Sequence, residues 1–230
     1  MAEIVYPPVI VALKTFWRYL GLQFHFEGEA HIPRKGGAIL AMNHIGYLDF
    51  ALIGTAALPA GRLVRFMAKK EIFDNKLAGP LMRGMHHINV DRSSGTASFV
   101  AALRALRSGE VVGIFPEGTI SRSFEIKELK SGAVRLAMGS GVPVIPTIVW
   151  GSQRIWTKGV SATYVARKFQ YLSLLAHQCS SKKVQMLMLE RKPYAKHFLI
   201  YCIKYKRNTP IATLASAGRR FVLVVQHLLP

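Results

Sequence analysis

Three polar side chains gather in the stretch NHIGYLD at 43–49, directly after the apolar run GGAILAM. A neutral imidazole such as His44 can accept a proton at neutral pH, and a carboxylate on its other ring nitrogen, here Asp49, fixes the tautomer. Residues five apart on a helix diverge by about 140°, so we expect Gly46 to let the chain turn tightly and Asp49, in the first helical turn, to reach back to His44. Asn43 is expected to hold the turn by bonding nearby backbone. The stretch predicts a general-base site.

Two further polar groups follow apolar strands. FPEGT at 115–119 places Glu117 after VVGIF, and HINVDR ends in Arg92. Because ligands of open α/β sheets bind at the carboxyl ends of strands, we expect both groups to lie near His44. All three residues have a plainer interpretation: His44 as a core histidine, Glu117 as a solvated turn residue, and Arg92 as half of a surface ion pair. His86 and His87 have no carboxylate at a telling interval and are interpreted as structural or exposed.

The elements that must position these groups alternate along residues 24–150. FHFEGE, AILAM, LVRFMAKK, HINVDR, VVGIF and VPVIPTIVW read as strands, and LDFALIGTAAL, TASFVAALRALRSGE and LKSGAVRLAMGSG read as helices. Strands alternating with helices predict an α/β fold, a layered, largely parallel sheet flanked by helices.

Two segments flank that core, giving three expected parts: a helix at 1–23, a catalytic domain at 24–159 and an atypical basic tail at 160–230. Apolar residues at helical spacing over 9–24 predict an amphipathic helix that either packs on the core or lies on a membrane surface. The tail has 12 Lys and Arg against one acidic residue. It is either a membrane-apposed appendage or a sequence that lost its native frame near Gly159, and we expect it to pack poorly on the core.

Composition narrows the classes of function. The 230 residues suit one domain with an appendage, and the absence of a basic leader or a long apolar run favours a cytoplasmic protein. Cys179 and Cys202 lack zinc-site or disulfide-scaffold spacing. The net charge of +19 suits nucleic acid, phosphorylated substrates or an anionic membrane. No nucleic-acid-binding motif accompanies the charge, so nucleic acid is disfavoured as a partner.

Four ordered blocks give the chain a family resemblance. NHIGYLD, INVDR, FPEGT and VPVIP, with the flanking MAKKEIF and LKSGA, resemble the blocks of glycerolipid acyltransferases of the lysophosphatidic acid acyltransferase type. The resemblance covers residues 24 to about 158. It implies that His44 and Asp49 are catalytic and that Asn43 belongs to the site. It further implies that VPVIP shapes the acyl-donor side.

The same resemblance assigns the remaining site residues to the acceptor. It implies that Glu117 positions the glycerol hydroxyls, that Gly118 and Thr119 offer hydrogen-bond donors, and that Arg92 binds the phosphate. Family members usually carry arginine after FPEGT, where this chain has Ile120. Arg122 is the substitute we expect for that contact.

The implied reaction transfers a fatty acyl group from acyl-CoA or acyl carrier protein to 1-acylglycerol 3-phosphate, giving phosphatidic acid at the cytoplasmic surface of an anionic membrane. Glycerol 3-phosphate and other lysolipids stay open as acceptors. No metal or cofactor is expected, and the absence of GxSxG, P-loop, HExxH and GxGxxG patterns favours direct attack by the acceptor hydroxyl. The alternative is a catalytically impaired, basic peripheral membrane-binding protein of the same fold.

Overall fold

The computed structural model of the chain describes residues 3–91 and 95–162 with their side chains, and the backbone of residues 170–176. Arg92, Cys179 and Cys202 therefore lie outside the described residues, as does most of the segment expected to form a basic tail. None of the helices in the described part of the chain is both long and apolar enough to cross a bilayer.

The described strands form one sheet in the order β1-β7-β6-β2-β5-β3-β4. Their bounds are β1 Leu22–Glu27, β2 Ala38–Met42, β3 Val64–Lys69, β4 Ile88–Val90, β5 Val111–Ile114, β6 Val144–Trp150 and β7 Gln170–Ala176. Every neighbouring pair is parallel except β6 with β7. The prediction of a layered, largely parallel sheet is confirmed.

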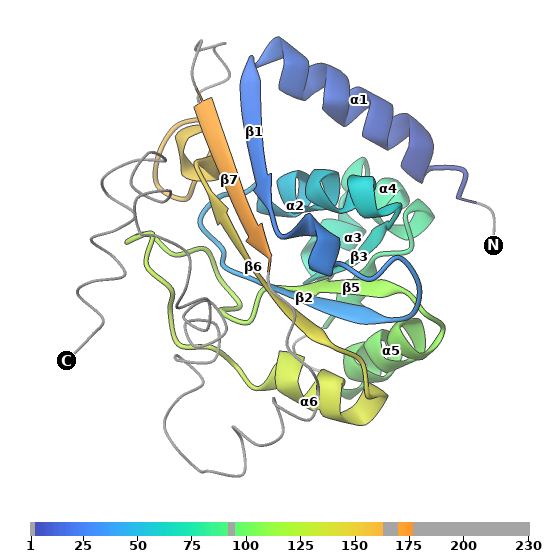
Figure 1. The fold of residues 1–230 in the computed structure, drawn as a ribbon. Helices are drawn as coiled ribbons and strands as arrows, with labels where there is room; N and C mark the ends of the chain where they lie inside the picture. The colour runs from blue at the N-terminus through green and yellow to red at the C-terminus, as the bar shows by residue number, and fades with distance from the viewer. Residues whose placement is uncertain (1–2, 92–94, 163–169, 177–230) are drawn as a thin grey trace.

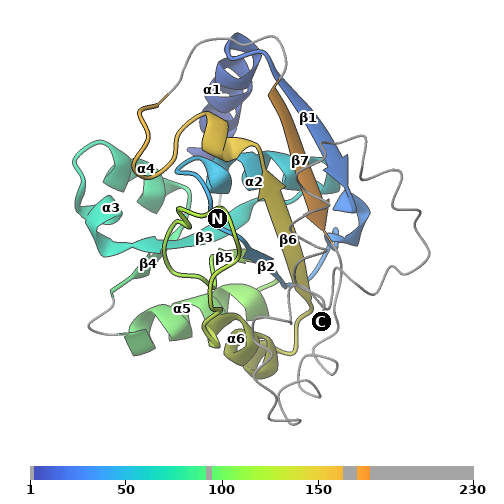
Figure 2. The same ribbon diagram turned by 90° about the vertical axis from the view of Figure 1, so that its left-hand side faces the viewer.

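Helices cover both faces of this sheet (Figure 1). Their bounds are α1 Tyr6–Tyr19, α2 Asp49–Ala57, α3 Lys70–Asp74, α4 Ala78–Gly84, α5 Gly95–Arg107 and α6 Gly132–Ser140, with short 3-10 turns at Glu29–His31, Leu58–Ala60 and Ser152–Arg154. Figure 2 shows α1 and α2 on one side of the sheet and α5 and α6 on the other. The resulting three layers are typical of α/β proteins.

Strand β2 shows how the sequence produces these layers. All five of its residues are buried, and their side chains alternate between two cores. Leu40 and Met42 pack with α1 and α2, whereas Ile39 and Ala41 pack with α5 and α6. A strand covered on both faces needs a continuous apolar run, which is what AILAM supplies.

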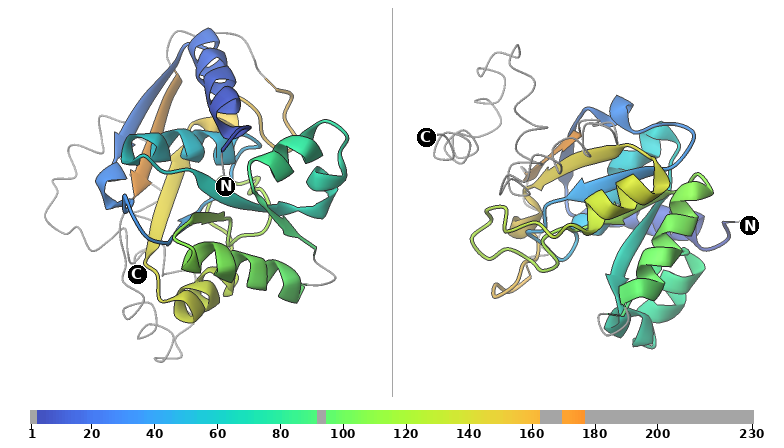
Figure 3. Two further views of the ribbon diagram at one scale, coloured as in Figure 1. Left: turned by 90° about the vertical axis from the view of Figure 1, so that its right-hand side faces the viewer. Right: turned by 90° about the horizontal axis from the view of Figure 1, so that it is seen from below.

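Helix α1 lies across α2, as the left panel of Figure 3 shows. Two prolines stand in its first turn, where the missing N–H costs nothing. Trp17 is 2% exposed and donates from its ring nitrogen to Thr55 on α2 at 3.1 Å, while Val11 and Tyr19 are 65% and 69% exposed. The helix thus packs one face on the core and leaves an apolar outer face in solvent.

The sheet continues beyond residue 159, where the catalytic domain was expected to end. The backbone of β7 pairs in parallel with β1 and in antiparallel fashion with β6. Residues 170–176 therefore belong to the sheet by their backbone, while the expectation that the tail packs poorly on the core stays a prediction. Backbone hydrogen bonding to strands on both sides needs no turn signal in the segment itself, which is why the pattern did not reveal it.

Candidate active site

Three parallel strands bring the polar clusters to one edge of the sheet. Strand β2 pairs with both β5 and β6 in parallel, so the carboxyl ends of all three strands lie at the same edge. His44 follows β2, Glu117 follows β5, and Ser152 follows β6. We call this group, together with Asp49 at the start of α2, the carboxyl-edge cluster. The prediction that NHIGYLD and FPEGT meet is confirmed.

His44 and Asp49 are hydrogen-bonded partners. The His44 Nδ1 atom lies 3.0 Å from Asp49 Oδ2, and the two side chains are 20% and 0% exposed. An ionised carboxylate only accepts, so Nδ1 carries the proton and Nε2 keeps its lone pair. The imidazole stacks on Phe115 with ring centroids 4.1 Å apart. The arrangement orients a base whose free nitrogen belongs to a partly exposed ring.

Several donors hold the Asp49 carboxylate in place. Oδ2 also accepts from the backbone N–H groups of Ile45 at 2.7 Å and Gly46 at 2.9 Å. Oδ1 accepts from the Ser152 hydroxyl at 2.5 Å. These donors fix the orientation of the carboxylate, so that Oδ2 faces the imidazole of His44.

Gly46 permits the turn that joins His44 to Asp49 because it has no side chain to collide with its neighbours, not because of an unusual backbone conformation. Its φ is not among the positive values in the chain. A Cβ at this position would lie 2.9 Å from the Ser152 hydroxyl oxygen and 3.1 Å from the Trp156 carbonyl oxygen. Any larger residue would therefore separate the loops that carry Asp49 and Ser152.

Asn43 has a different partner from the one expected. Its amide donates to the Val149 carbonyl at 3.0 Å and accepts from the Val149 N–H at 2.8 Å. The side chain thus continues the pairing of β2 with β6 rather than bonding local backbone. With both amide atoms engaged and 4% exposure, Asn43 joins the strands under the site.

Glu117 connects two loops. One carboxylate oxygen accepts from the backbone N–H of His44 at 2.9 Å, and the other accepts from that of Lys127 at 3.2 Å. Burial raises the pKa of this carboxyl above its usual range, and the two hydrogen bonds oppose that rise. The position predicted for Glu117 beside His44 is confirmed, while its contact with acceptor hydroxyls stays a prediction.

Three of the other predicted residues follow Glu117 in the same loop. Gly118 has a φ of 70°, which favours glycine, and Thr119 is exposed beside it. Arg122 is exposed two residues after the buried Ile120. Arg92, as stated above, lies outside the described residues. Its predicted phosphate contact stays a prediction.

The sequence analysis missed the loop after β6. Besides Ser152, which bonds Asp49, Thr157 is buried and donates to the Ile45 carbonyl at 2.6 Å. Both residues stand in GSQRIWT, which resembles an ordinary turn. The signal that could have found Ser152 is its place two residues after a buried strand, the same signal that identified Glu117.

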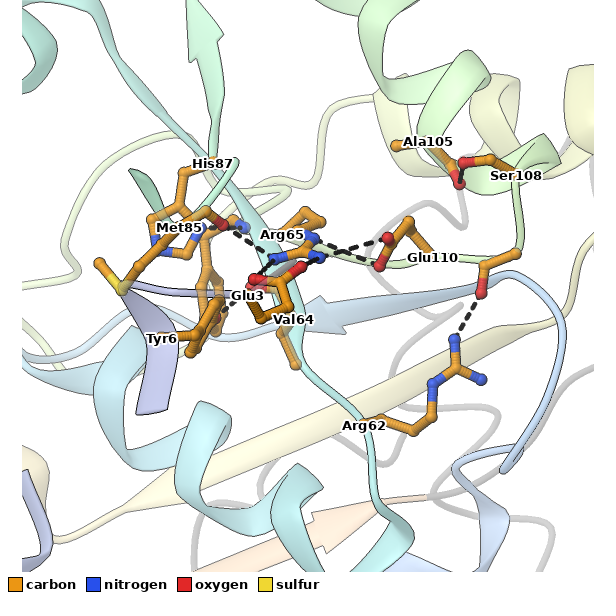
Figure 4. Close-up of polar contacts among 12 residues, drawn as sticks. Glu3, Tyr6, Arg62, Val64, Arg65, Met85, His87, Ala105, Ser108 and Glu110 are labelled. Carbon is orange, nitrogen blue, oxygen red and sulfur yellow. Dashed lines mark hydrogen bonds and ion pairs between the residues drawn. The ribbon is translucent and has the colours of Figure 1, made fainter. Parts of the chain in front are cut away.

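A second buried polar cluster lies at the opposite edge, where strands begin (Figure 4). Arg65, early in β3, forms ion pairs with Glu3 and with Glu110, which precedes β5, and donates to the Met85 carbonyl at 2.9 Å. Burial lowers the Arg65 pKa, but the hydrogen bonds and charges of Glu3 and Glu110 together outweigh it and leave the pKa raised. We call Glu3, Tyr6, Arg65, His87 and Glu110 the amino-edge cluster.

His87 belongs to that second cluster and is structural, as one of the two interpretations held. Its Nδ1 accepts from the Phe66 N–H at 3.1 Å, and 8% of the residue is exposed. Burial, with smaller contributions from Arg65 and His86, lowers the His87 pKa to about 4. The ring is therefore neutral at neutral pH, with its proton on Nε2.

The carboxyl-edge cluster can thus remove a proton from an alcohol, and its chemistry rests on imidazole and carboxylate. Within residues 3–91 and 95–162, no group of His, Cys, Asp and Glu side chains is arranged to hold a metal ion.

Comparison with known proteins places this edge in context. A family model described as Acyltransferase matches residues 23–150. Over 124 residues the chain is 37% identical to the 1-acyl-sn-glycerol-3-phosphate acyltransferase of Bacillus subtilis, a match covering 54% of this chain and 60% of that protein. A protein of the same name from Limnanthes douglasii is 32% identical over 154 residues, covering 65% and 53%. The matched part of the chain spans between half and two thirds of the length of these relatives.

A solved structure shares the fold. The crystal structure of the 1-acyl-sn-glycerophosphate (LPA) acyltransferase from Thermotoga maritima superposes with a TM-score of 0.60, covering 80% of each chain at 22% sequence identity. At that identity the likeness concerns the arrangement of helices and strands.

Proposed function

Because the chain belongs to the Acyltransferase family, we propose that it transfers a fatty acyl group from a thioester donor to 1-acylglycerol 3-phosphate, giving phosphatidic acid. The observation that carries the proposal is the His44–Asp49 hydrogen bond of 3.0 Å, which leaves the other ring nitrogen as a base at the ligand-binding edge of the sheet. The names of the relatives support this acceptor. The donor is acyl-CoA or acyl carrier protein.

The proposed reaction needs one base and no covalent intermediate. His44 Nε2 takes the proton of the acceptor hydroxyl as its oxygen attacks the thioester carbonyl carbon. The carbon–sulfur bond then breaks, and the imidazolium returns the proton to the leaving thiolate. Asp49 stabilises the imidazolium between these steps. Glu117 fixes the backbone of His44 and thereby the position of the ring.

A substrate panel tests the proposal. Purified protein is given radiolabelled acyl-CoA or acyl carrier protein with 1-acylglycerol 3-phosphate, glycerol 3-phosphate or 1-acylglycerol, and the lipid products are separated. We expect phosphatidic acid to form fastest from 1-acylglycerol 3-phosphate. Absence of acyl transfer in every combination, with binding to anionic vesicles retained, would favour the impaired membrane-binding alternative.

We further propose that the protein works at an anionic membrane surface on the cytoplasmic side, using the outer face of α1. That face exposes Val11 and Tyr19 beside the basic residues Lys14 and Arg18, a combination that suits a lipid interface. Val11→Glu with Tyr19→Glu should reduce sedimentation with phosphatidylglycerol vesicles, whereas Val100→Glu on α5 should not. Equal sedimentation of all variants would remove α1 from the interface.

A further inference from the structure

The loop after FPEGT leaves the acceptor phosphate without its expected cation. Ile120 occupies the position after Thr119, and only 7% of it is exposed, so its side chain belongs to the interior. Arg122 is exposed, and within residues 3–91 and 95–162 it forms no ion pair that would fix it beside the base. A basic group fixed over residues 118–120 would fill this need, and the segment at 127–130 supplies two.

Lys127 lies directly over the loop. Its ammonium donates to the Thr119 hydroxyl oxygen at 3.2 Å and to the Ile120 carbonyl at 2.9 Å. Its backbone N–H donates to Glu117 at 3.2 Å, so both ends of the residue are anchored. An ammonium has three donors, and acceptors in the described part of the chain take two of them. The third can be given to an anion without moving the side chain.

Lys130, three residues further along the chain, approaches the same loop. Its backbone N–H donates to the Pro116 carbonyl at 3.0 Å. A Cβ built on Gly118 would lie 3.4 Å from both Cε and Nζ of Lys130, so the ammonium stands over this glycine. Within the described part of the chain, no carboxylate forms an ion pair with Lys130. Among the described residues, its positive charge therefore has no close carboxylate to neutralise it.

The same loop is attached to the base. Glu117 accepts from the His44 N–H at 2.9 Å, and the Ser121 N–H donates to the His44 carbonyl at 2.7 Å. Residues 117–121 therefore run along the backbone of His44. The Lys127 ammonium bonds this short segment, and the Lys130 ammonium lies beside it. A phosphate held by them would lie close to the residue that activates the hydroxyl of the same small molecule.

We propose that Lys127 and Lys130 bind the phosphate of the acceptor. They would replace the arginine expected at the position of Ile120. This inference rests on the proposed function. A phosphate monoester near neutral pH carries between one and two negative charges, which two lysines match, and charge-assisted hydrogen bonds are the strong ones. The phosphates of coenzyme A share this chemistry, so the test separates acceptor from donor.

Steady-state kinetics with 1-acylglycerol 3-phosphate and acyl-CoA provide the test. Lys127→Met and Lys130→Met should each raise the acceptor KM about tenfold to hundredfold, the loss expected for a hydrogen bond to a charged group. The donor KM and kcat should change less than twofold, and Lys127→Arg should restore much of the loss. Lys35→Met, an exposed lysine before β2 at the opposite edge, is the matched control. The preference for 1-acylglycerol 3-phosphate over 1-acylglycerol should shrink by the same factor.

A binding arm separates this inference from the proposed function. Calorimetric titration with glycerol 3-phosphate should show binding to the wild-type protein that Lys127→Met weakens, even if no acyl transfer occurs; in that case the site stands and the function fails. An unchanged acceptor KM and unchanged binding in both methionine variants of an active enzyme would overturn the inference alone. A rise confined to the donor KM would also overturn it and assign the lysines to coenzyme A.

Discussion

The two edges of the sheet each bury a polar cluster with a histidine, and the two histidines hold their protons on different nitrogens. At the carboxyl edge, Nδ1 of His44 donates to Asp49 and the free lone pair is on Nε2. At the amino edge, Nδ1 of His87 accepts from the Phe66 N–H, so Nε2 carries the proton. Only the first ring can act as a base through its outer nitrogen.

The clusters also differ in how their charges are used. Arg65 is 5% exposed, and its guanidinium donates to two carboxylates and a backbone carbonyl within the protein. These contacts join separate parts of the fold. The Asp49 carboxylate is equally occupied, yet it supports a ring that is 20% exposed. Burial of polar groups does not by itself identify an active site. An active site is distinguished by a side chain that is held by hydrogen bonds and still has a free lone pair on a partly exposed ring, as His44 has.

Among variants of the two clusters, Asp49→Asn is expected to have the largest effect on activity. The amide cannot stabilise an imidazolium and favours the wrong tautomer, so kcat should fall by roughly 10² to 10⁴. Initial rates of phosphatidic acid formation measure this loss. Asp74→Asn, an exposed carboxylate on α3, serves as the control and should retain full activity. A kcat for Asp49→Asn within threefold of wild type would detach Asp49 from catalysis.

Arg65→Met should lower the stability of the protein and leave kcat almost unchanged. Removing one partner of a buried ion pair costs up to 5 kcal/mol, and about 3 kcal/mol is expected here because Glu110 is 38% exposed. Urea denaturation should show the loss, while kcat of the folded protein stays within twofold of wild type. Arg104→Met on the exposed side of α5 is the control. A large fall in kcat without loss of stability would place Arg65 in the catalytic machinery.

The buried His87 predicts a pH dependence of stability. Its folded-state pKa of about 4 lies below the ordinary 6.5, so the unfolded chain binds more protons between those values and stability falls as pH decreases through this window. The loss from this group should be about 2 kcal/mol at pH 5. His87→Asn keeps an acceptor for Phe66 and should lose less stability between pH 7 and 5. Parallel curves for the two proteins would refute the assignment.

Ser152→Ala should have the smallest effect. The variant loses one charge-assisted hydrogen bond to Asp49, worth on the order of 1.5 kcal/mol, so kcat should fall about tenfold. The acceptor KM should stay unchanged, because Ser152 acts through Asp49. Ser152→Thr should recover part of the rate if the longer side chain fits, and Ser108→Ala on the surface is the control. Equal rates for Ser152→Ala and wild type would leave Ser152 a packing role only.

The sequence predicted the carboxyl edge better than the rest of the molecule because strand ends carry a local signal. Apolar runs such as AILAM identify buried strands, and parallel pairing brings the residues that follow them together, as His44 and Glu117 show. Partners distant in the chain carry no such signal. Asn43 bonds Val149, 106 residues away, and Arg65 pairs with Glu3 and Glu110 through tertiary packing alone.

The most direct test of the account compares the two histidines. Initial rates of acyl transfer from acyl-CoA to 1-acylglycerol 3-phosphate are measured for His44→Ala and His87→Asn at pH 7.5, each normalised to folded protein by circular dichroism. General-base assistance is worth roughly 10² to 10⁴ in rate, so His44→Ala should lose at least about a hundredfold while His87→Asn stays within twofold of wild type. A folded His44→Ala protein that keeps more than half of the wild-type rate would contradict the account.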